Sequence, residues 1–280
     1  MRFEEPEGPN PEHPLLPLLS GKTFDFIQKG GNHRPIKGDE CVMSKRSTRP
    51  VLSLSLALCV LSGPGCTNRE YKFGELTRLA DEYKTDKGSM LHHYTEVYEH
   101  FFYPMRASAR KICEIGVLEG ASLEMFADFF GGAVIYGIDI KDASHLNSDR
   151  IRTFVADQSD RKQLAAFLDA DGSDFDLILD DGGHTMPQQQ VSFAYLFKYV
   201  RTGGYYVIED VHTSLLSGYA VEPGEGNSTL TMINHFVRSG QIESKYMTEE
   251  ERQYLNLNIS YCNLMSRDKG TSMTCIFKKK

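Results

Sequence analysis

The chain has 280 residues, a formal net charge of −7, 40% hydrophobic residues and 25% charged residues. This length can hold one large domain with a modest extension, and the composition is that of a globular protein with a full core. The acidic balance argues against a nucleic-acid partner, because binding phosphates requires a basic face. The six cysteines form no CxxC pair and no zinc-ligand spacing, so we expect no structural zinc.

Residues 1–70 differ in composition from the rest, and we divide the chain into this extension and a domain over 71–280. The first 42 residues are rich in proline, glycine and charge, which predicts disorder. The segment 43–66 has a basic start, an apolar run and small residues before Cys66, so it resembles a bacterial secretory or lipoprotein signal. Its apolar run is too short to span a bilayer comfortably. The alternative is an overlong gene start with an incidental apolar stretch.

Two helices are predicted at the start of the domain. The apolar positions predict a helix over 73–83, with Phe73 on its apolar stripe, and a second helix with an aromatic stripe over 94–102 that Pro104 ends. The aromatic stripe could form an interface between copies of the chain as readily as a core, so a homo-oligomer is one of the possibilities.

Strands and helices then alternate. We expect strands over 111–117, 133–140, 151–156, 175–179 and 205–208, and helices over 121–130, 160–168 and 188–200. This alternation predicts a parallel sheet with right-handed crossovers. Two further β-rich runs, 257–264 and 272–277, predict an antiparallel C-terminal hairpin. The expected fold is therefore α/β: a class I methyltransferase (Rossmann-like), doubly wound, mostly parallel seven-stranded sheet. A nicotinamide dehydrogenase domain would continue with a parallel sixth strand instead.

Acidic side chains follow each of the five predicted parallel strands. They are Glu114, Asp139, Asp157, the pair Asp180 and Asp181, and the pair Glu209 and Asp210. Ligands of doubly wound sheets bind beyond the carboxyl ends of the strands, where these residues meet. Gathering carboxylates there is costly unless donors, a cation or a cationic ligand compensate them, so we expect a ligand site at this edge.

The first three strand ends carry features of a nucleoside site. Gly116 and Gly120 permit a tight turn and a close approach of the next helix, although a purely structural turn explains their spacing equally well. Asp139 is placed to accept hydrogen bonds from ribose hydroxyls, as in NAD and S-adenosylmethionine sites alike. Asp157 and Gln158 offer an acceptor and a donor to an adenine edge, and the alternative is an N-cap of the following helix.

The last two strand ends indicate a cation and a base. Asp181, Glu209 and Asp210 can supply part of the octahedral oxygen shell of a hard cation such as Mg²⁺. His184 follows Asp181 by three residues and can take the proton of a hydroxyl whose pKa a metal has lowered. The alternatives are a loop histidine with a structural hydrogen bond, and a helix cap formed by the Glu209-Asp210 pair.

Together these motifs resemble the macrocin and mycinamicin sugar O-methyltransferases over residues 79–216. The matching stretches are Glu114-Ile-Gly-Val, Tyr-Gly-Ile-Asp139, Asp157-Gln158-Ser-Asp, Asp180-Asp181-Gly-x-His184 and Tyr-Tyr-Val-Ile-Glu209-Asp210. The resemblance implies an S-adenosylmethionine-dependent fold, Mg²⁺ held by the residues Asp181, Glu209 and Asp210, and His184 as general base. We assign to the cofactor Glu114, Gly116, Gly120, Asp139, Asp157, Gln158 and Asp180. The segment Lys84–Gly88 resembles the part that covers the cofactor in that family.

The departures from the family are Gly183 in place of serine, the bulky pair Leu118-Glu119 in the glycine loop, the export-like segment and the lack of a separate N-terminal domain. They leave the acceptor open.

The expected function is a Mg²⁺-dependent O-methyltransferase acting in the cytoplasm on a hydroxyl of a glycosylated or polyhydroxylated small molecule, as in natural-product biosynthesis. We expect no nucleic-acid partner and no stable membrane span. The alternatives are a catechol-type enzyme with a cation at the same strand ends, and a non-catalytic exported cofactor-binding protein anchored through Cys66. A nicotinamide dehydrogenase is disfavoured by the glycine spacing. The poorly patterned segment 211–250 is expected to form a lid or substrate loop.

Overall fold

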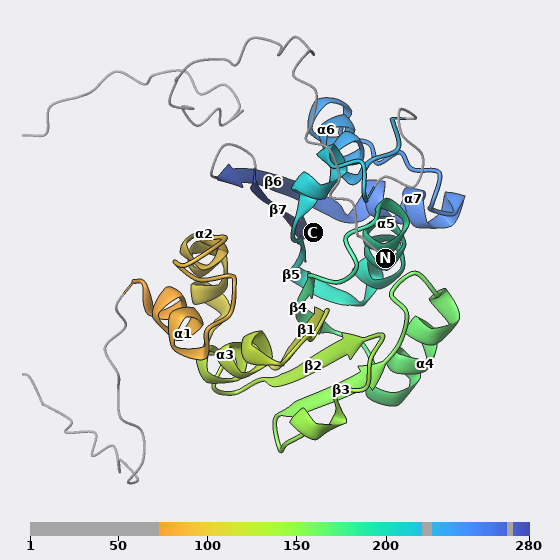
Figure 1. Cartoon of the computed structure of the whole chain (residues 1–280). Helices are drawn as coiled ribbons and strands as arrows, with labels where there is room; N and C mark the ends of the chain where they lie inside the picture. Colours follow the sequence, from red (N-terminus) through yellow and green to blue (C-terminus); the bar gives the residue numbers. More distant parts are fainter. Residues whose placement is uncertain (1–72, 220–225, 268–270) are drawn as a thin grey trace, which may run out of the picture. The chain divides into compact units, whose positions relative to one another are not determined.

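The computed structural model describes residues 73–219, 226–267 and 271–280, so the predicted extension over 1–70 and its signal-like segment 43–66 lie outside the described residues. The described part is built on a seven-stranded sheet in the order β3-β2-β1-β4-β5-β7-β6 (Figure 1). The strands are β1 Lys111–Ile115, β2 Val134–Asp139, β3 Ile151–Val155, β4 Phe175–Asp180, β5 Val200–Ile208, β6 Ile259–Arg267 and β7 Ser272–Lys279. β1 to β5 pair in parallel, and β7 runs antiparallel to both β5 and β6. The predicted fold class is confirmed.

Helices cover both faces of the sheet. They are α1 Glu75–Tyr83, α2 Tyr94–Phe102, α3 Ala121–Phe129, α4 Arg161–Asp171, α5 Met186–Leu196, α6 Thr229–Ser239 and α7 Glu249–Asn258. The first three lie on one face, and α4 to α7 lie on the other (Figure 1). Alternate strand residues supply the two cores: Ile112 and Leu177 pack with α1 to α3, whereas Cys113 and Ile178 pack on the opposite face. This alternation follows from the two-residue period of a strand.

Several local predictions were wrong. Phe73 precedes α1 and is 58% exposed, because Gly74 begins the helix in a left-handed conformation. By contrast, the helix predicted over 94–102 is confirmed as α2, which ends at Phe102 and gives way to a 3-10 turn, Tyr103–Met105, that contains Pro104. The helix expected over 188–200 is α5, which begins earlier at the capping residue Thr185 and gives way to a 3-10 turn, Phe197–Tyr199. The strand expected over 205–208 is β5, which already begins at Val200 and has an irregularity in its pairing with β4.

The segment 211–250 was also predicted wrongly, as a loop. It contains a 3-10 helix, Val211–Leu215, all of α6 and the start of α7. None of the helices in the described part of the chain has the length and apolar character of a membrane span.

Candidate active site

A cavity of about 570 Å³ opens at the carboxyl ends of the parallel strands. The turns after all five strands line it, together with the segment 84–87 that precedes α2. The predicted site residues that line the cavity are Gly116, Asp139, Asp157, Gln158, Asp181, His184 and Asp210. The other four, Glu114, Gly120, Asp180 and Glu209, do not line it.

The turn after β1 brings two strand ends into contact. Gly116 has a φ of 87°, and a Cβ at this position would lie 2.1 Å from the carbonyl oxygen of Asp181. Asp139 holds the same turn from β2, because its carboxylate accepts hydrogen bonds from the amides of Val117 and Lys141, each at 2.8 Å. A carboxylate can accept about four hydrogen bonds, so Asp139 can accept further bonds from a ligand in the cavity.

The end of β3 is tied to the loop after β4. The amide of Gln158 is engaged on both sides: its Nε2 donates to Asp180 at 2.9 Å, and its Oε1 accepts from the Gly183 amide at 2.7 Å. Asp157 accepts from the amide of Ser159 at 2.8 Å and lines the cavity. The N-cap of α4 is Asp160, so the helix cap that the sequence offered as the alternative at this strand end is present. Recognition of an adenine edge by these residues stays a prediction. Asp157 is better placed for it than Gln158, because both ends of the Gln158 side-chain amide already have partners.

Asp180 is buried behind the cavity. Its carboxylate accepts from four donors, which are the side chains of Gln158, Ser192 and Tyr206 and the amide of Gly182. Burial raises the pKa of Asp180 to about 6. This arrangement fixes the course of the loop that carries Asp181 and His184.

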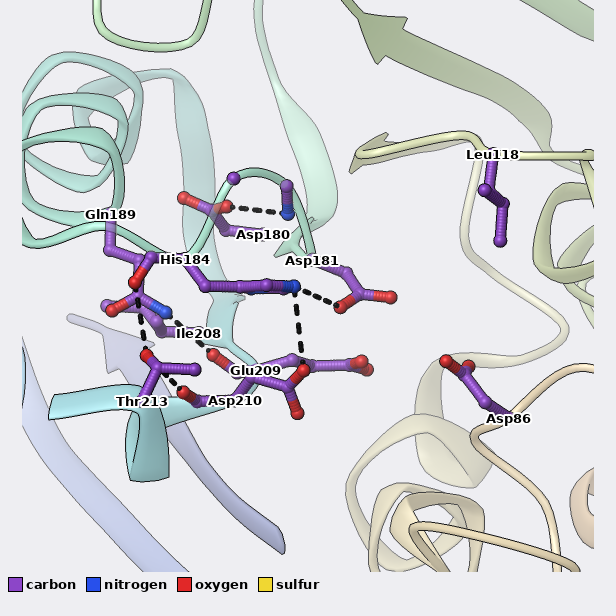
Figure 2. A network of polar contacts seen from close by, with 12 residues as sticks. Asp86, Leu118, Asp180, Asp181, His184, Gln189, Ile208, Glu209, Asp210 and Thr213 are labelled. Carbon is purple, nitrogen blue, oxygen red and sulfur yellow. Dashed lines mark hydrogen bonds and ion pairs between the residues drawn. The ribbon is translucent and has the colours of Figure 1, made fainter. Parts of the chain in front are cut away.

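Three polar side chains converge at the rim of the cavity. Ligand atoms of Asp181, His184 and Asp210 lie within 4.8 Å of one another. His184 Nε2 is 3.5 Å from Asp210 Oδ2 and 3.9 Å from Asp181 Oδ1, while its buried Nδ1 has no hydrogen-bond partner among the described residues. Figure 2 shows these residues gathered together, with Asp86 and Leu118 on the opposite side of the space between the loops. The set provides oxygen and nitrogen ligands of the kind that divalent cations accept.

One buried threonine supports this group. His184 and Asp210 adopt left-handed backbone conformations, with φ of 56° and 50°. Such strain persists where surrounding structure over-determines it, and it is concentrated at functional sites. Thr213 Oγ1 lies 3.0 Å from the His184 carbonyl and 2.8 Å from the Asp210 carbonyl (Figure 2). The sequence indicated Asp210 as a cation ligand, with a helix cap as the alternative, and neither interpretation included this shared support of the His184 backbone.

Glu209 lies behind the rim and is 1% exposed. Its carboxylate accepts from the hydroxyl of Tyr98 at 2.7 Å and from Lys87 Nζ at 2.9 Å, and its carbonyl accepts from Gln189. Burial, together with the nearby charge of Asp181, raises the pKa of Glu209 well above its usual range. The structure thus groups two of the three predicted cation ligands with His184 and leaves Glu209 with Tyr98 and Lys87.

Lys87 is the residue that sequence reasoning missed. It is 1% exposed, and its ammonium contacts Asp181 and Glu209 and lies 3.5 Å from Glu114 Oε1. Its three partners lie 27, 94 and 122 residues further along the chain, so no local pattern could indicate them. The only signal was the likeness of its loop to a cofactor-covering segment.

Glu114 is the most deeply buried carboxylate near Lys87. It is fully buried, and Ser122 donates to its Oε2 at 2.7 Å, whereas Oε1 has no hydrogen-bond partner in the described part of the chain. Burial raises its pKa to about 7.

Comparison with known proteins agrees with this geometry. No protein-family model matches the sequence. The demethylmacrocin O-methyltransferase of Streptomyces fradiae is 38% identical over 176 residues, which are 60% of this chain and 44% of that protein. The mycinamicin VI 2''-O-methyltransferase of Micromonospora griseorubida is 38% identical over 174 residues, or 59% of this chain and 43% of that protein. The chain therefore spans about half the length of the curated relatives that it matches.

Solved structures show the same relationship. The MycE methyltransferase from the mycinamycin biosynthetic pathway, in complex with Mg and SAH, superimposes with a TM-score of 0.63 at 30% identity, over 74% of this chain and 55% of that one. Its complex with Mg, SAH and mycinamycin VI gives a TM-score of 0.61 at 31% identity, over 73% and 54% of the two chains.

The sheet order, the antiparallel end and this likeness define a class I methyltransferase fold. Within that class, the chain is similar to the macrocin and mycinamicin type of sugar O-methyltransferases over about half of their length, which agrees with the resemblance seen in its motifs.

Proposed function

We propose that this chain is an S-adenosylmethionine-dependent and Mg²⁺-dependent O-methyltransferase that acts on a hydroxyl of a glycosylated or polyhydroxylated small molecule. The observation that carries the proposal is the meeting of Asp181, His184 and Asp210 at the rim of a cavity whose inner wall presents Asp139. The relatives named above act on sugar-bearing natural products, which supports this acceptor class.

The described residues fit both ligands. The cavity of about 570 Å³ falls within the usual size range of cofactor sites. The unpartnered Nδ1 of His184 and Oε1 of Glu114 are buried polar atoms whose hydrogen bonds remain to be made. Asp139 and Asp157 would hold the nucleoside end, and Asp181 with Asp210, backed by Glu209, would hold the cation.

The residues then have distinct roles in methyl transfer. When bound, S-adenosylmethionine supplies an electrophilic methyl group and Mg²⁺ lowers the pKa of an acceptor hydroxyl. His184 Nε2 would take the hydroxyl proton, and Asp210, whose Oδ2 lies 3.5 Å from that nitrogen, would stabilise the imidazolium that results. Thr213 keeps the backbones of these two residues in place. Much of the rate gain would come from this positioning.

Calorimetric titration with S-adenosylmethionine, S-adenosylhomocysteine and NAD, each with and without Mg²⁺, tests the cofactor. We expect binding of the first two and none of NAD. Transfer assays with sugar-bearing natural products and with catechols then test the acceptor. His184→Ala should slow transfer by about 100- to 10,000-fold at saturating cofactor, and Asp181→Asn should require much more Mg²⁺. Wild-type rates in both variants would refute the assigned roles.

S-adenosylmethionine is made in the cytoplasm, so this chemistry favours a cytoplasmic enzyme. The signal-like segment 43–66 is the feature that speaks for export. Mass spectrometry of the mature N-terminus distinguishes the two, since a lipidated Cys66 would contradict the cytoplasmic proposal.

A further inference from the structure

Lys87 occupies the centre of the acidic edge, and the mechanism above gives it no role. Its side chain is 2% exposed, and its ammonium contacts Asp181 and Glu209, two of the residues proposed to hold the cation. It also lies 3.5 Å from Glu114, so one positive charge serves three buried or half-buried carboxylates from three different strands. A cation that binds these carboxylates competes with this ammonium, because two positive charges a few Å apart repel each other.

The segment that carries Lys87 also forms a wall of the cofactor cavity. Residues 84–87 line the cavity together with the turn after β1. The backbone on both sides of Lys87 is fixed: its carbonyl accepts from the amide of Thr95 at 3.1 Å, and the Thr85 amide donates to Ala80 at 3.0 Å. The side chain can therefore change partners by rotation about its own bonds while the segment stays in place.

The cofactor would offer the displaced ammonium a new partner. Its sulfonium joins a ribose on one side to an amino-acid group on the other. If Asp139 holds the ribose and the methyl group faces His184, the amino-acid end would lie within the same cavity, one wall of which is the segment that carries Lys87. A lysine is suited to this exchange, because its charge sits at the end of a flexible four-carbon stem.

We propose that Lys87 is a positioning residue that couples the cation site to the cofactor site, and this inference rests on the proposed function. Without ligands, Lys87 neutralises Asp181 and Glu209. When a divalent cation takes these carboxylates, the ammonium turns into the cavity and pairs with the carboxylate of the cofactor. Each ligand then strengthens the binding of the other, and the coupling has to be reciprocal.

Calorimetry on the full chain tests the coupling through binding alone. In the wild type, Mg²⁺ should tighten S-adenosylmethionine binding, and the cofactor should tighten Mg²⁺ binding by the same factor, about 10-fold or more. Lys87→Met should bind Mg²⁺ tighter than the wild type in the absence of cofactor, since the competing ammonium is gone, and should lose most of the coupling. Lys162→Met is the control: Lys162 is an exposed lysine on α4 that does not line the cavity, so this variant should keep the coupling.

The outcomes separate the inference from the proposed function. If the wild type binds neither S-adenosylmethionine nor Mg²⁺, the proposed function fails and the inference fails with it. If both ligands bind, but Lys87→Met binds Mg²⁺ no tighter than the wild type or retains its coupling, the inference alone is overturned. Weaker Mg²⁺ binding by the variant would also overturn it, because it would show that Lys87 only organises the ligands.

A second measurement uses the wild-type protein, in case Lys87→Met does not fold. Acetylation by an N-hydroxysuccinimide ester, followed by peptide mass spectrometry, reports whether each lysine is accessible. Lys87 should be protected without ligands, react at least several-fold faster with Mg²⁺ alone, and become protected again with Mg²⁺ and cofactor together. The exposed Lys162 on α4 serves as the internal reference. Equal protection of Lys87 in all three states would overturn the exchange.

Discussion

Gly116→Ala tests whether the close approach of the turns after β1 and β4 sets the position of the cation ligands. A Cβ at residue 116 would lie 2.1 Å from the carbonyl oxygen of Asp181 and 2.9 Å from the Cα of Gly182. Both atoms belong to the backbone, so a side-chain rotation cannot relieve the contact. The left-handed φ of 87° adds about 1–2 kcal/mol of strain for a residue with a Cβ, and overpacking adds about 1–3 kcal/mol.

Gly203→Ala is the matched control for this variant. Gly203 also has a left-handed φ, 75°, but a Cβ there would meet nothing within 4 Å. Urea unfolding should show a loss of about 1–2 kcal/mol for the control, from backbone strain alone. The Gly116 variant should lose about 2–5 kcal/mol, the sum of the two costs.

The same variant should also impair methyl transfer more than its stability loss explains. Relieving the contact moves Asp181 by about 1 Å, and a misplacement on this scale can cost about 100-fold in rate. The assay is transfer at saturating cofactor, at a temperature where both variants are folded. If Gly116→Ala matches Gly203→Ala in unfolding free energy and in rate, the turn does not position Asp181 as we argue.

Three further predictions follow from the support of the site. Because the pKa of Asp180 is raised to about 6 from 3.8, the folded state binds a proton between these pH values that the unfolded state does not, so the free energy of unfolding should fall as the pH rises from about 4 to 6. Asp180→Asn should reduce that slope by up to one proton in metal-free unfolding titrations, with Glu114 and Glu209 supplying the remainder, and an unchanged slope would contradict the assignment. Thr213→Val should lower the transfer rate at least about 10-fold while the far-ultraviolet circular dichroism stays unchanged, because the His184 and Asp210 backbones lose their shared partner; a wild-type rate would show that they need none. Tyr98→Phe removes a buried donor 2.7 Å from a carboxylate and should lower the free energy of unfolding by about 1–3 kcal/mol, whereas a change below about 0.5 kcal/mol would show that this bond contributes little.

The sheet could be predicted because its signals are local. Buried runs such as 175–180 alternate with amphipathic helices, and each strand end is marked by a carboxylate or a glycine. The segment 211–250 could not be interpreted in the same way, because α6 buries few apolar residues and α7 buries only Leu255 among its described side chains. Their starts were nevertheless marked by the capping residues Ser228 and Thr248, a signal that the apolar pattern alone overlooks.

Part of the candidate site could also be predicted from local sequence signals, and part of it could not. The positions of Asp181, His184 and Asp210 follow from strand ends that a parallel sheet brings together, and the structure groups them. The roles of Lys87 and Thr213 depend on contacts with residues far away in the chain or on left-handed backbone, neither of which has a pattern in the sequence.

The way in which the strand-end charges are compensated indicates which ligand the site accepts. Asp139 is satisfied by backbone amides and Asp180 by four donors, so neither needs an external cation. Glu209 also accepts from Tyr98, but the ammonium of Lys87 is the one positive charge that Glu209 and Asp181 share. A divalent cation is the ligand that corrects this imbalance, because it brings two charges where the lysine brings one. The number of acidic residues at the sheet edge therefore does not define the cation site. What defines it is which of these carboxylates have too few donors within the protein, and the sequence alone does not show which ones they are.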